Sequence, residues 1–227
     1  MSRGIAATIA ITKKDLRTEL RTRESLNASA SFALVILVLF SFAFDLGREE
    51  FYAISGGLLW LVYSFAGALI VNRSFARELP NDCLDVLTAS PAPGWAIFLG
   101  KALAAFFLLL IVEIISLPVF GLFYNIRWMD SFGSLVLVIL LATWGITVVG
   151  TAFSAVTVNI RLRELLLPAL LYPILIPLLI GAMGTTTALF GGEKLTGDSL
   201  SSLRLLVGFD VIYTSLGLYL IEFILIV

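Results

Sequence analysis

Apolar residues are gathered in six long runs that are separated by short polar segments. A helix needs about 20 apolar residues to cross a bilayer, because each residue advances ~1.5 Å and the hydrocarbon core is ~30 Å thick. The runs cover residues 28–44, 51–71, 95–124, 135–158, 165–183 and 205–227. The polar segments between them are too short for a soluble domain. The pattern therefore predicts six transmembrane helices in a single transmembrane domain, 1–227.

Residues 1–27, before the first run, show the periodicity of an amphipathic helix. At ~100° per residue the apolar side chains fall within one narrow arc, which holds Ile5, Ile9, Leu16 and Leu20. Basic side chains lie on one flank of this arc and acidic ones on the other, namely Lys13, Lys14, Arg17 and Arg21 against Asp15 and Glu19. We expect an interfacial helix on the cytoplasmic membrane surface. A basic topology signal without regular structure is the alternative.

Composition supports an all-α integral membrane protein. Hydrophobic residues make up 59% of the chain and charged residues 14%, and the mean hydropathy is +1.03. Soluble domains average about 45–50% apolar and about 25% charged residues. A soluble core of this size could not bury so much apolar surface.

The rare residue types exclude several kinds of chemistry. Histidine is absent and Cys83 is the single cysteine, which excludes a disulfide within the chain, Cys-rich metal sites, and Ser-His-Asp or Cys-His catalysis. The sequence has no G-x-x-x-x-G-K-[ST] phosphate-binding loop, so the chain does not hydrolyse ATP in that way by itself. We expect no enzyme activity, no catalytic residue and no metal site. The net charge of −1 gives no attraction to nucleic acid.

The distribution of Lys and Arg predicts that both termini are cytoplasmic. Eleven of the fifteen lie on the side of the N-terminus: Arg3, Lys13, Lys14, Arg17, Arg21, Arg23, Arg73, Arg77, Lys101, Arg161 and Arg163. The other side has Arg48, Arg127, Lys194 and Arg204. Basic residues favour the cytoplasmic side, and an even number of spans returns the C-terminus to it.

Two ionisable residues lie within predicted spans, where an unpaired charge is costly. Glu113 is near the middle of the third span and Asp210 lies inside the sixth. They indicate either a polar seam along a substrate route or subunit contact, or local hydrogen bonding. Lys101 and Glu222 are close enough to the cytoplasmic surface to reach it with their long side chains.

Prolines mark the fifth span. Pro168, Pro173 and Pro177 each remove a helical N–H and press on the preceding turn. We expect them to break or kink this helix. Residues 184–204, which follow, are too polar to span and predict an outer loop or a re-entrant segment.

Residues 72–94 form a polar loop between the second and third spans and predict a short cytoplasmic helix. Pro80 suits a first helical turn, and Pro91 and Pro93 end the segment. Leu84 and Leu87 share one face. This geometry suits docking into a groove on a soluble partner; a solvated connector is the alternative.

This loop resembles the coupling segment of ABC-2-type exporter permeases, in which a Glu is followed by Leu-Asp/Glu-x-Leu and then Pro. Within that group the sequence is similar to the CcmB family of haem-exporter permeases. The resemblance covers roughly residues 56–182, including Phe75-Ala76-Arg77-Glu78-Leu79, Leu84-Asp85-Val86-Leu87 and the proline ladder after Arg163. The family often has Asp-Gly-Ser where this chain has Asn81-Asp82-Cys83.

The resemblance implies a permease subunit in the bacterial inner membrane that works with a separate cytoplasmic ABC ATPase and with haem-handling membrane subunits. ATP hydrolysis in that system drives release of a haem-loaded chaperone for cytochrome c maturation. The ATPase-coupling residues would be Arg77, Glu78, Asp82, Leu84, Asp85 and Leu87. Haem would be the transported or handled ligand of the complex and not a cofactor of this chain alone, since the chain has no His and a cytoplasmic Cys83, which leaves only Tyr, Met129 and Met183 as iron ligands.

The family's ATPases act as dimers, so we expect a homodimer of permease subunits. Its contact would use small-residue faces such as Gly145 and Gly150, or Gly57 and Gly67. Two alternatives stay open: an ABC-2-type permease for another substrate, such as a lipid or drug, and a membrane scaffold that does not transport. An aspartyl intramembrane protease is disfavoured, because Val207-Gly208-Phe209-Asp210 does not match G-x-G-D.

Overall fold

The computed structural model describes residues 2–43, 48–80, 83–193 and 195–225, and these are largely helical with no strand among them. Six helices are long and apolar enough to cross a membrane, which confirms the predicted number of spans. The helices are α1 (Ser2–Thr22), α2 (Glu24–Ala43), α3 (Arg48–Ala76), α4 (Cys83–Thr88), α5 (Gly94–Tyr124), the 3-10 turn η2 (Trp128–Ser131), α6 (Phe132–Thr157), α7 (Arg163–Phe190) and α8 (Asp198–Leu225).

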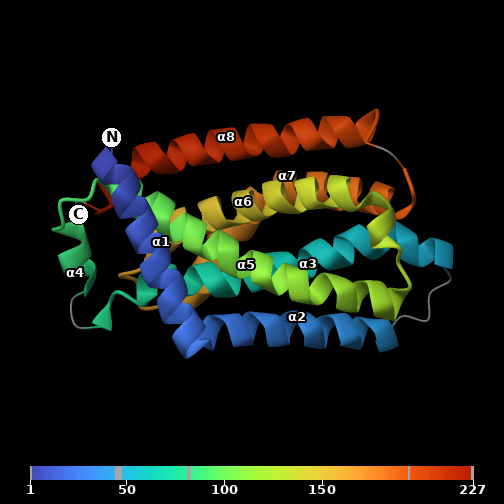
Figure 1. Ribbon diagram of the computed structural model, residues 1–227, viewed down its shortest axis with the longest axis horizontal. Coiled ribbons are helices and arrows are strands. Elements are labelled where there is room, and N and C mark those ends of the chain that lie inside the picture. Colours follow the sequence, from blue (N-terminus) through green and yellow to red (C-terminus); the bar gives the residue numbers. More distant parts are fainter. Residues whose placement is uncertain (1, 44–47, 81–82, 194, 226–227) are drawn as a thin grey trace.

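The six long helices run side by side, with α8 and α2 at opposite edges of the bundle (Figure 1). Helix α1 crosses one end of the bundle, with its axis transverse to the spans, and α4 lies at the same end. Both chain ends are near this end too. We call it the α4 end. A helix that lies across the ends of membrane spans has the orientation expected of an interfacial helix.

Helices α3 and α6 supply much of the buried core, because their membrane-crossing windows are the most buried. Gly150 of α6 packs directly on Val71 of α3, where an added Cβ would come within 2.7 Å of the valine side chain. Gly67 of α3 packs in the same way on Ile146. Small residues allow this close approach of helices in a membrane. The expectation that Gly67 and Gly150 form a contact between subunits is therefore wrong, since both are used inside one chain.

The corner between α1 and α2 lies earlier than predicted. Arg23 turns the chain with a φ of 55°, and α2 begins at Glu24 instead of residue 28. The side chain of Glu19 accepts a hydrogen bond from the backbone N–H of Leu26 at 2.8 Å. This N–H belongs to the first turn of α2, whose amides have no partner within the helix. The polar residues before the apolar run are thus helical because α1 caps them.

Helix α7 is continuous from Arg163 to Phe190 and contains Pro168, Pro173 and Pro177. The helix is therefore not interrupted at these prolines, and a kink at them stays a prediction. Leu167, Leu171 and other residues on one face of α7 are buried against the bundle, and packing of this kind compensates for the lost N–H groups in membrane helices. Residues 184–204 are largely helical as well, because α7 extends to Phe190 and α8 begins at Asp198. The connection between them is therefore short.

Candidate functional site

The chain leaves α3 through a tight turn that leads to α4. The N–H of Glu78 donates to the carbonyl of Phe75 at 2.9 Å. The N–H of Leu84, in the first turn of α4, donates to the carbonyl of Glu78 at 2.8 Å. Asp82, one of the predicted coupling residues, lies outside the described residues. The backbone of Glu78 is therefore directly bonded to α4.

The side chain of Glu78 points into a cluster of charges formed with Lys101, Lys14 and Asp15, which we call the Glu78 cluster; Lys101 is buried, whereas the Lys14 side chain is 47% exposed. Lys101 of α5 is fully buried, and its Nζ donates to Glu78 Oε1 at 2.9 Å, to Asp15 Oδ2 at 3.2 Å and to the carbonyl of Ser74 at 2.8 Å. These bonds use all three protons of the ammonium group. Lys14 of α1 also bonds Glu78 Oε1, and its Nζ lies 3.2 Å from Asp15 Oδ1.

Electrostatic interaction keeps this cluster charged. Burial by itself would raise the pKa of Glu78, but the ammonium groups of Lys101 and Lys14 outweigh it and hold that pKa below its ordinary value. Burial would lower the pKa of Lys14, but Glu78 and Asp15 outweigh it and raise the pKa. Both shifts favour the ionised forms, so the cluster is an ion-paired network.

A second set of bonds joins the end of α3 to the corner of α1 and α2. Arg77 bonds the fully buried carboxylate of Glu19 and the hydroxyl of Ser25. Arg73 pairs with Glu24 at 2.7 Å on the surface. Arg77 and Glu78, predicted as ATPase-coupling residues, therefore bind other helices of the same chain. Their side chains are directed inward.

Helix α1 is fixed along α5 by polar contacts and close packing. Thr8 donates to the carbonyl of Ala96 at 3.3 Å, and Thr12 donates to the carbonyl of Gly100 at 3.0 Å. A Cβ at Gly100 would lie 2.8 Å from the side chain of Ile11. The Glu78 cluster thus joins three elements, α1, α5 and the turn before α4.

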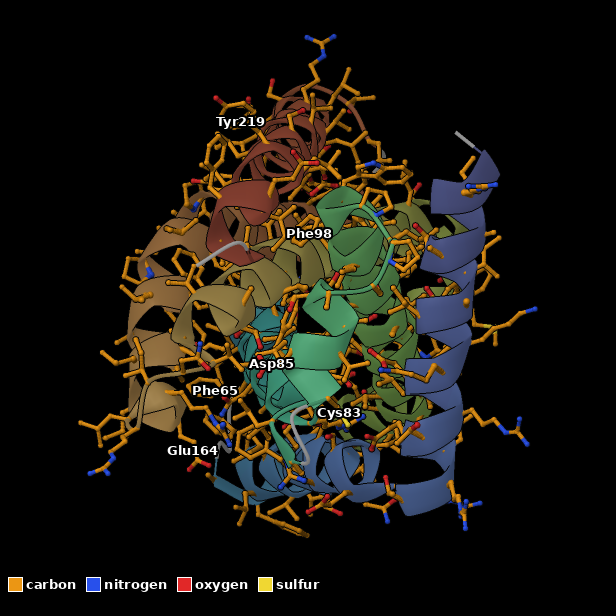
Figure 2. The ribbon with its side chains drawn as sticks, turned by 90° about the vertical axis from the view of Figure 1, so that its left-hand side faces the viewer. Phe65, Cys83, Asp85, Phe98, Glu164 and Tyr219 are labelled. Carbon is orange, nitrogen blue, oxygen red and sulfur yellow. The ribbon has the colours of Figure 1, made fainter. Side chains whose placement is uncertain are left out.

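Helix α4 has one side toward the chain and one toward solvent. Leu84 and Leu87 are half-buried and pack against a small core that includes Phe75. Figure 2, which looks at the α4 end, shows Cys83 and Asp85 on α4, and both are exposed. Val86 is 71% exposed. The two leucines expected to enter a partner's groove pack against the chain itself, and the exposed side of α4 consists of Cys83, Asp85, Val86 and Thr88.

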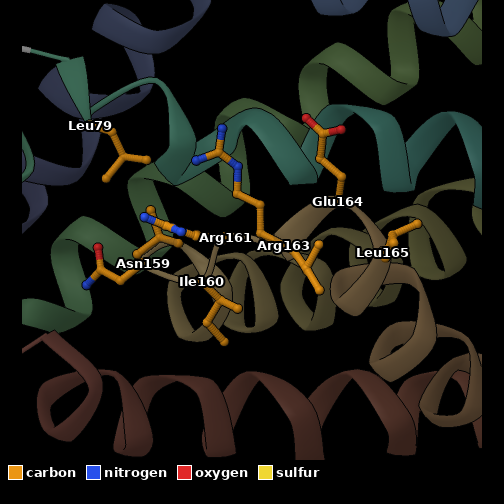
Figure 3. Close-up of a pocket in the computed structure, with 9 residues that line it drawn as sticks. Leu79, Asn159, Ile160, Arg161, Arg163, Glu164 and Leu165 are labelled. Carbon is orange, nitrogen blue, oxygen red and sulfur yellow. The ribbon is translucent and has the colours of Figure 1, made fainter.

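An open pocket of about 700 Å³ lies beside this loop, with Leu79 on one side and Glu164 on the other (Figure 3). It is lined by residues 158–165, which include the connection from α6 to α7 and the first turn of α7. Arg161 in this connection is exposed, and no ion pair involves it among the described residues. A neighbouring pocket of about 580 Å³ includes Arg73, Arg77 and Arg163. The surface around α4 therefore combines an apolar residue with several cationic ones.

The two intramembrane carboxylates lie in separate environments. Both oxygens of Glu113 accept from Thr143 Oγ1, at 2.7 and 2.9 Å. Asp210 of α8 is also buried, but neither of its oxygens has a hydrogen-bond partner in the described structure. It packs on Gly145 of α6, where a Cβ would lie 2.8 Å from Asp210 Oδ1. No hydrogen bond among the described residues links the two carboxylates, and Gly145 belongs to this internal contact.

Sequence reasoning placed Asp15 and Glu19 on one flank of α1 but did not recognise that this flank docks on the bundle. It also expected Lys101 to reach the membrane surface, whereas the side chain is completely buried. The sequence does contain an indication of this docking, because two carboxylates four residues apart on α1 need cationic partners when they are buried. For metal binding, no group of three or more Asp, Glu, Cys or His residues occurs within the described ranges.

Comparison with known proteins extends over nearly the whole chain. The family model of the CcmB protein matches residues 6–223. Heme exporter protein B of Rhodobacter capsulatus is 30% identical over 171 residues, which are 75% of this chain and 78% of that protein. Heme exporter protein B of Bradyrhizobium diazoefficiens is 28% identical over 199 residues, 88% and 89% of the two chains. The protein of the same name from Paracoccus denitrificans is 29% identical over 184 residues, 81% and 84% of the two chains.

The matched region includes the interfacial helix, the α4 loop and all four residues of the Glu78 cluster. Since the family model covers the sequence from within α1 to the last turns of α8, the chain belongs to the CcmB protein family.

Proposed function

We propose that this chain is the transmembrane permease subunit of a haem exporter for cytochrome c maturation in the bacterial inner membrane. The family match, the six spans and the names of the relatives support this function. ATP is hydrolysed by a separate cytoplasmic ABC ATPase. The α4 end faces the cytoplasm, as the distribution of Lys and Arg favours.

One observation supports a coupling role more than any other: Glu78 bonds α4 through its backbone and bonds α1 and α5 through its side chain. A force on α4 is therefore applied to an interfacial helix and a membrane span at the same time. Packed elements move as units, because interiors are dense and do not deform continuously. In this proposal, the Glu78 cluster transmits the movement that the ATPase imposes on α4 to α1 and α5.

The ATPase docks on the exposed side of α4. Val86 supplies an exposed apolar contact, and Asp85 supplies a charge that sets the register of α4 on the ATPase. A charge at the rim of an interface contributes ~1 kcal/mol or less and is weakened by salt. Arg161, beside the pocket of Figure 3, offers a cationic contact next to α4. Two copies of the chain serve an ATPase dimer, with one α4 for each ATPase.

Haem handling falls mainly to partner subunits. The chain has no histidine and its single cysteine lies on α4, so the usual strong axial ligands are missing from its membrane region. Met183 lines an open apolar pocket of about 570 Å³ between α2, α3 and α7, far along the bundle from α4. Transmission of movement, with haem iron held by a partner, fits these residues best.

The docking site can be tested with the native cysteine. Cys83 is exposed and adjacent to Val86 on α4, so it should crosslink to a cysteine placed in the docking groove of the ATPase. Val86→Asp should abolish the crosslink and the co-purification of the ATPase without reducing the amount of the chain in the membrane. Phe42→Asp, at an exposed apolar position on the far part of α2, is the control and should leave the crosslink intact. Crosslinking and co-purification that survive Val86→Asp would show that α4 is a connector.

A further inference from the structure

Helix α1 has three distinct faces, and only one of them contacts the rest of the chain. The docked face holds buried residues, including Thr8, Thr12 and Glu19. The second face is apolar and about half exposed, with Ile5 at 51%, Ile9 at 49% and Leu20 at 51%. The third face carries three exposed basic residues, Lys13, Arg17 and Arg21. None of these three has an ion-pair or hydrogen-bond partner within the residues that the structure describes.

The order of these faces around the helix fixes their directions. Viewed from the α4 end, α1 lies along one edge of the bundle with its N-terminus at the top (Figure 2). A right-handed helix with its docked face toward the bundle turns its next arc away from the viewer, along the spans. That arc is the apolar one. The basic arc follows and points sideways, out from the edge of the bundle.

This arrangement matches the layers of a membrane surface. The apolar face is directed to the level of the acyl chains, and the basic face extends sideways at the level of the headgroups. Residues 13, 17 and 21 are four apart, so they form a row with steps of ~6 Å along the helix. We propose that this row, Lys13, Arg17 and Arg21, binds the headgroups of anionic phospholipids and thereby holds α1 on the membrane.

An anionic lipid fits this surface better than a soluble partner. Among the described residues no acidic side chain pairs with the basic row, and Asp15 and Glu19 of α1 are engaged on the docked face. The neighbouring apolar face requires a hydrocarbon environment, and a membrane supplies both at once. Lys14, by contrast, bonds Glu78 and is not part of the row. The inference does not depend on haem export, since it requires only that the six spans cross a bilayer.

The test measures which lipids surround α1 in the full chain. A fluorophore is attached at Ala10→Cys in a Cys83→Ser background, because Ala10 is exposed and lies about one turn before Lys13, on the same side of α1 as the row. The chain is placed in nanodiscs, and quenching is compared between nitroxide-labelled phosphatidylglycerol and phosphatidylcholine at equal mole fractions. We expect the anionic lipid to quench more strongly, with a local preference of roughly fivefold for one interacting Lys or Arg.

The preference should disappear in the variant Lys13→Gln/Arg17→Gln/Arg21→Gln and should shrink in 1 M salt. The control variant Arg161→Gln/Arg163→Gln removes cations elsewhere at the α4 end and should retain the preference for the anionic lipid. Equal quenching by both lipids, or a preference that survives in the triple variant, would overturn the proposal. So would protection of the fluorophore from both lipids when the ATPase is bound, because the row would then contact a protein.

Discussion

Glu78 makes contacts in three directions from one residue, since its carbonyl holds α4 and its carboxylate holds α1 and α5. Lys101 is the partner on α5 and is completely buried. A buried charge that loses its partner costs several kcal/mol, whereas a pair removed together costs less. The energetic role of the cluster therefore lies in the pairing of these two side chains.

A double-mutant cycle measures that pairing. Glu78→Gln and Lys101→Met should each lower the free energy of unfolding by about 1–3 kcal/mol, because each leaves a buried partner underbonded. The double variant should lose about 1–2 kcal/mol less than the sum. Denaturation in mixed detergent micelles gives the values. Arg127→Gln, in the exposed pair with Asp130, is the control and should change stability by less than about 0.5 kcal/mol. Strictly additive effects of the two single substitutions would contradict a stabilising interaction between Glu78 and Lys101.

The pKa shifts predict an acid-sensitive contact between α1 and α5. The pKa of Glu78 is held below its ordinary value of 4.5, so its contribution to stability is complete above pH 4.5 and is lost as the pH falls through the lowered pKa. The pKa of Lys14 is raised above 10.5, so its contribution is complete below pH 10.5 and disappears only at higher pH.

Trp95 reports this contact, because its ring packs directly on Gly4 of α1. The signal of Trp95 is the difference in fluorescence between the unsubstituted chain and Trp95→Phe. We expect this difference to stay constant between pH 4.5 and 10.5 and to change below pH 4.5. Glu78→Gln should abolish that acid transition. A transition of the same size in the variant would assign it to other groups.

At the residue scale, the sequence predicts which side chains are costly to bury without a partner. It does not predict which of these side chains contact one another. Lys101 lies near the α4 end of α5, so its depth predicted a side chain extending to the membrane surface. Its actual partners, Asp15 and Glu78, are 86 and 23 residues away along the chain. Only the packing of α1 on α5 brings these residues together.

At the scale of elements, the contact of α1 with α5 depends on close approach at Gly100. A Cβ there would lie 3.0 Å from the carbonyl oxygen of Thr8 and 2.8 Å from Ile11. Gly100→Ala should push α1 outward, lower stability by about 1–3 kcal/mol and speed hydrogen exchange in α1. Gly208→Ala is the matched control, because that glycine is in a helix with open space around it. Exchange in α1 that is equal in both variants would contradict the packing described.

The number and position of the membrane helices could be predicted because length and apolarity alone decide whether a segment spans. Their ends could not, since α2 begins early owing to a cap supplied by Glu19 of another helix. Helix α7 continues through its three prolines for a related reason. A proline removes one hydrogen bond locally, but the buried face of α7, with Leu171 and Leu175, stabilises the helix through its neighbours.

At the scale of the whole molecule, the composition predicts how the purified subunit treats haem. The chain offers no histidine, and Met129 and Met183 are distant in the fold from the exposed Cys83. We expect the isolated subunit to show no stoichiometric Soret band after gel filtration, because strong axial ligands are missing. A haem peak that co-elutes with the subunit and disappears in Met183→Leu would instead assign haem binding to the apolar pocket of α2, α3 and α7.

The central claim is that Glu78 transmits the movement of α4 and does not itself recruit the ATPase. ATP hydrolysis by the assembled complex is compared with cytochrome c maturation in cells for Glu78→Gln, with Arg127→Gln as the control for loss of an exposed charge away from α1 and α4. We expect that Glu78→Gln keeps the ATPase bound and hydrolysing while maturation falls at least tenfold, roughly the effect of 1.4 kcal/mol on a coupling equilibrium. Normal maturation in Glu78→Gln, or loss of the ATPase from the complex, would contradict it.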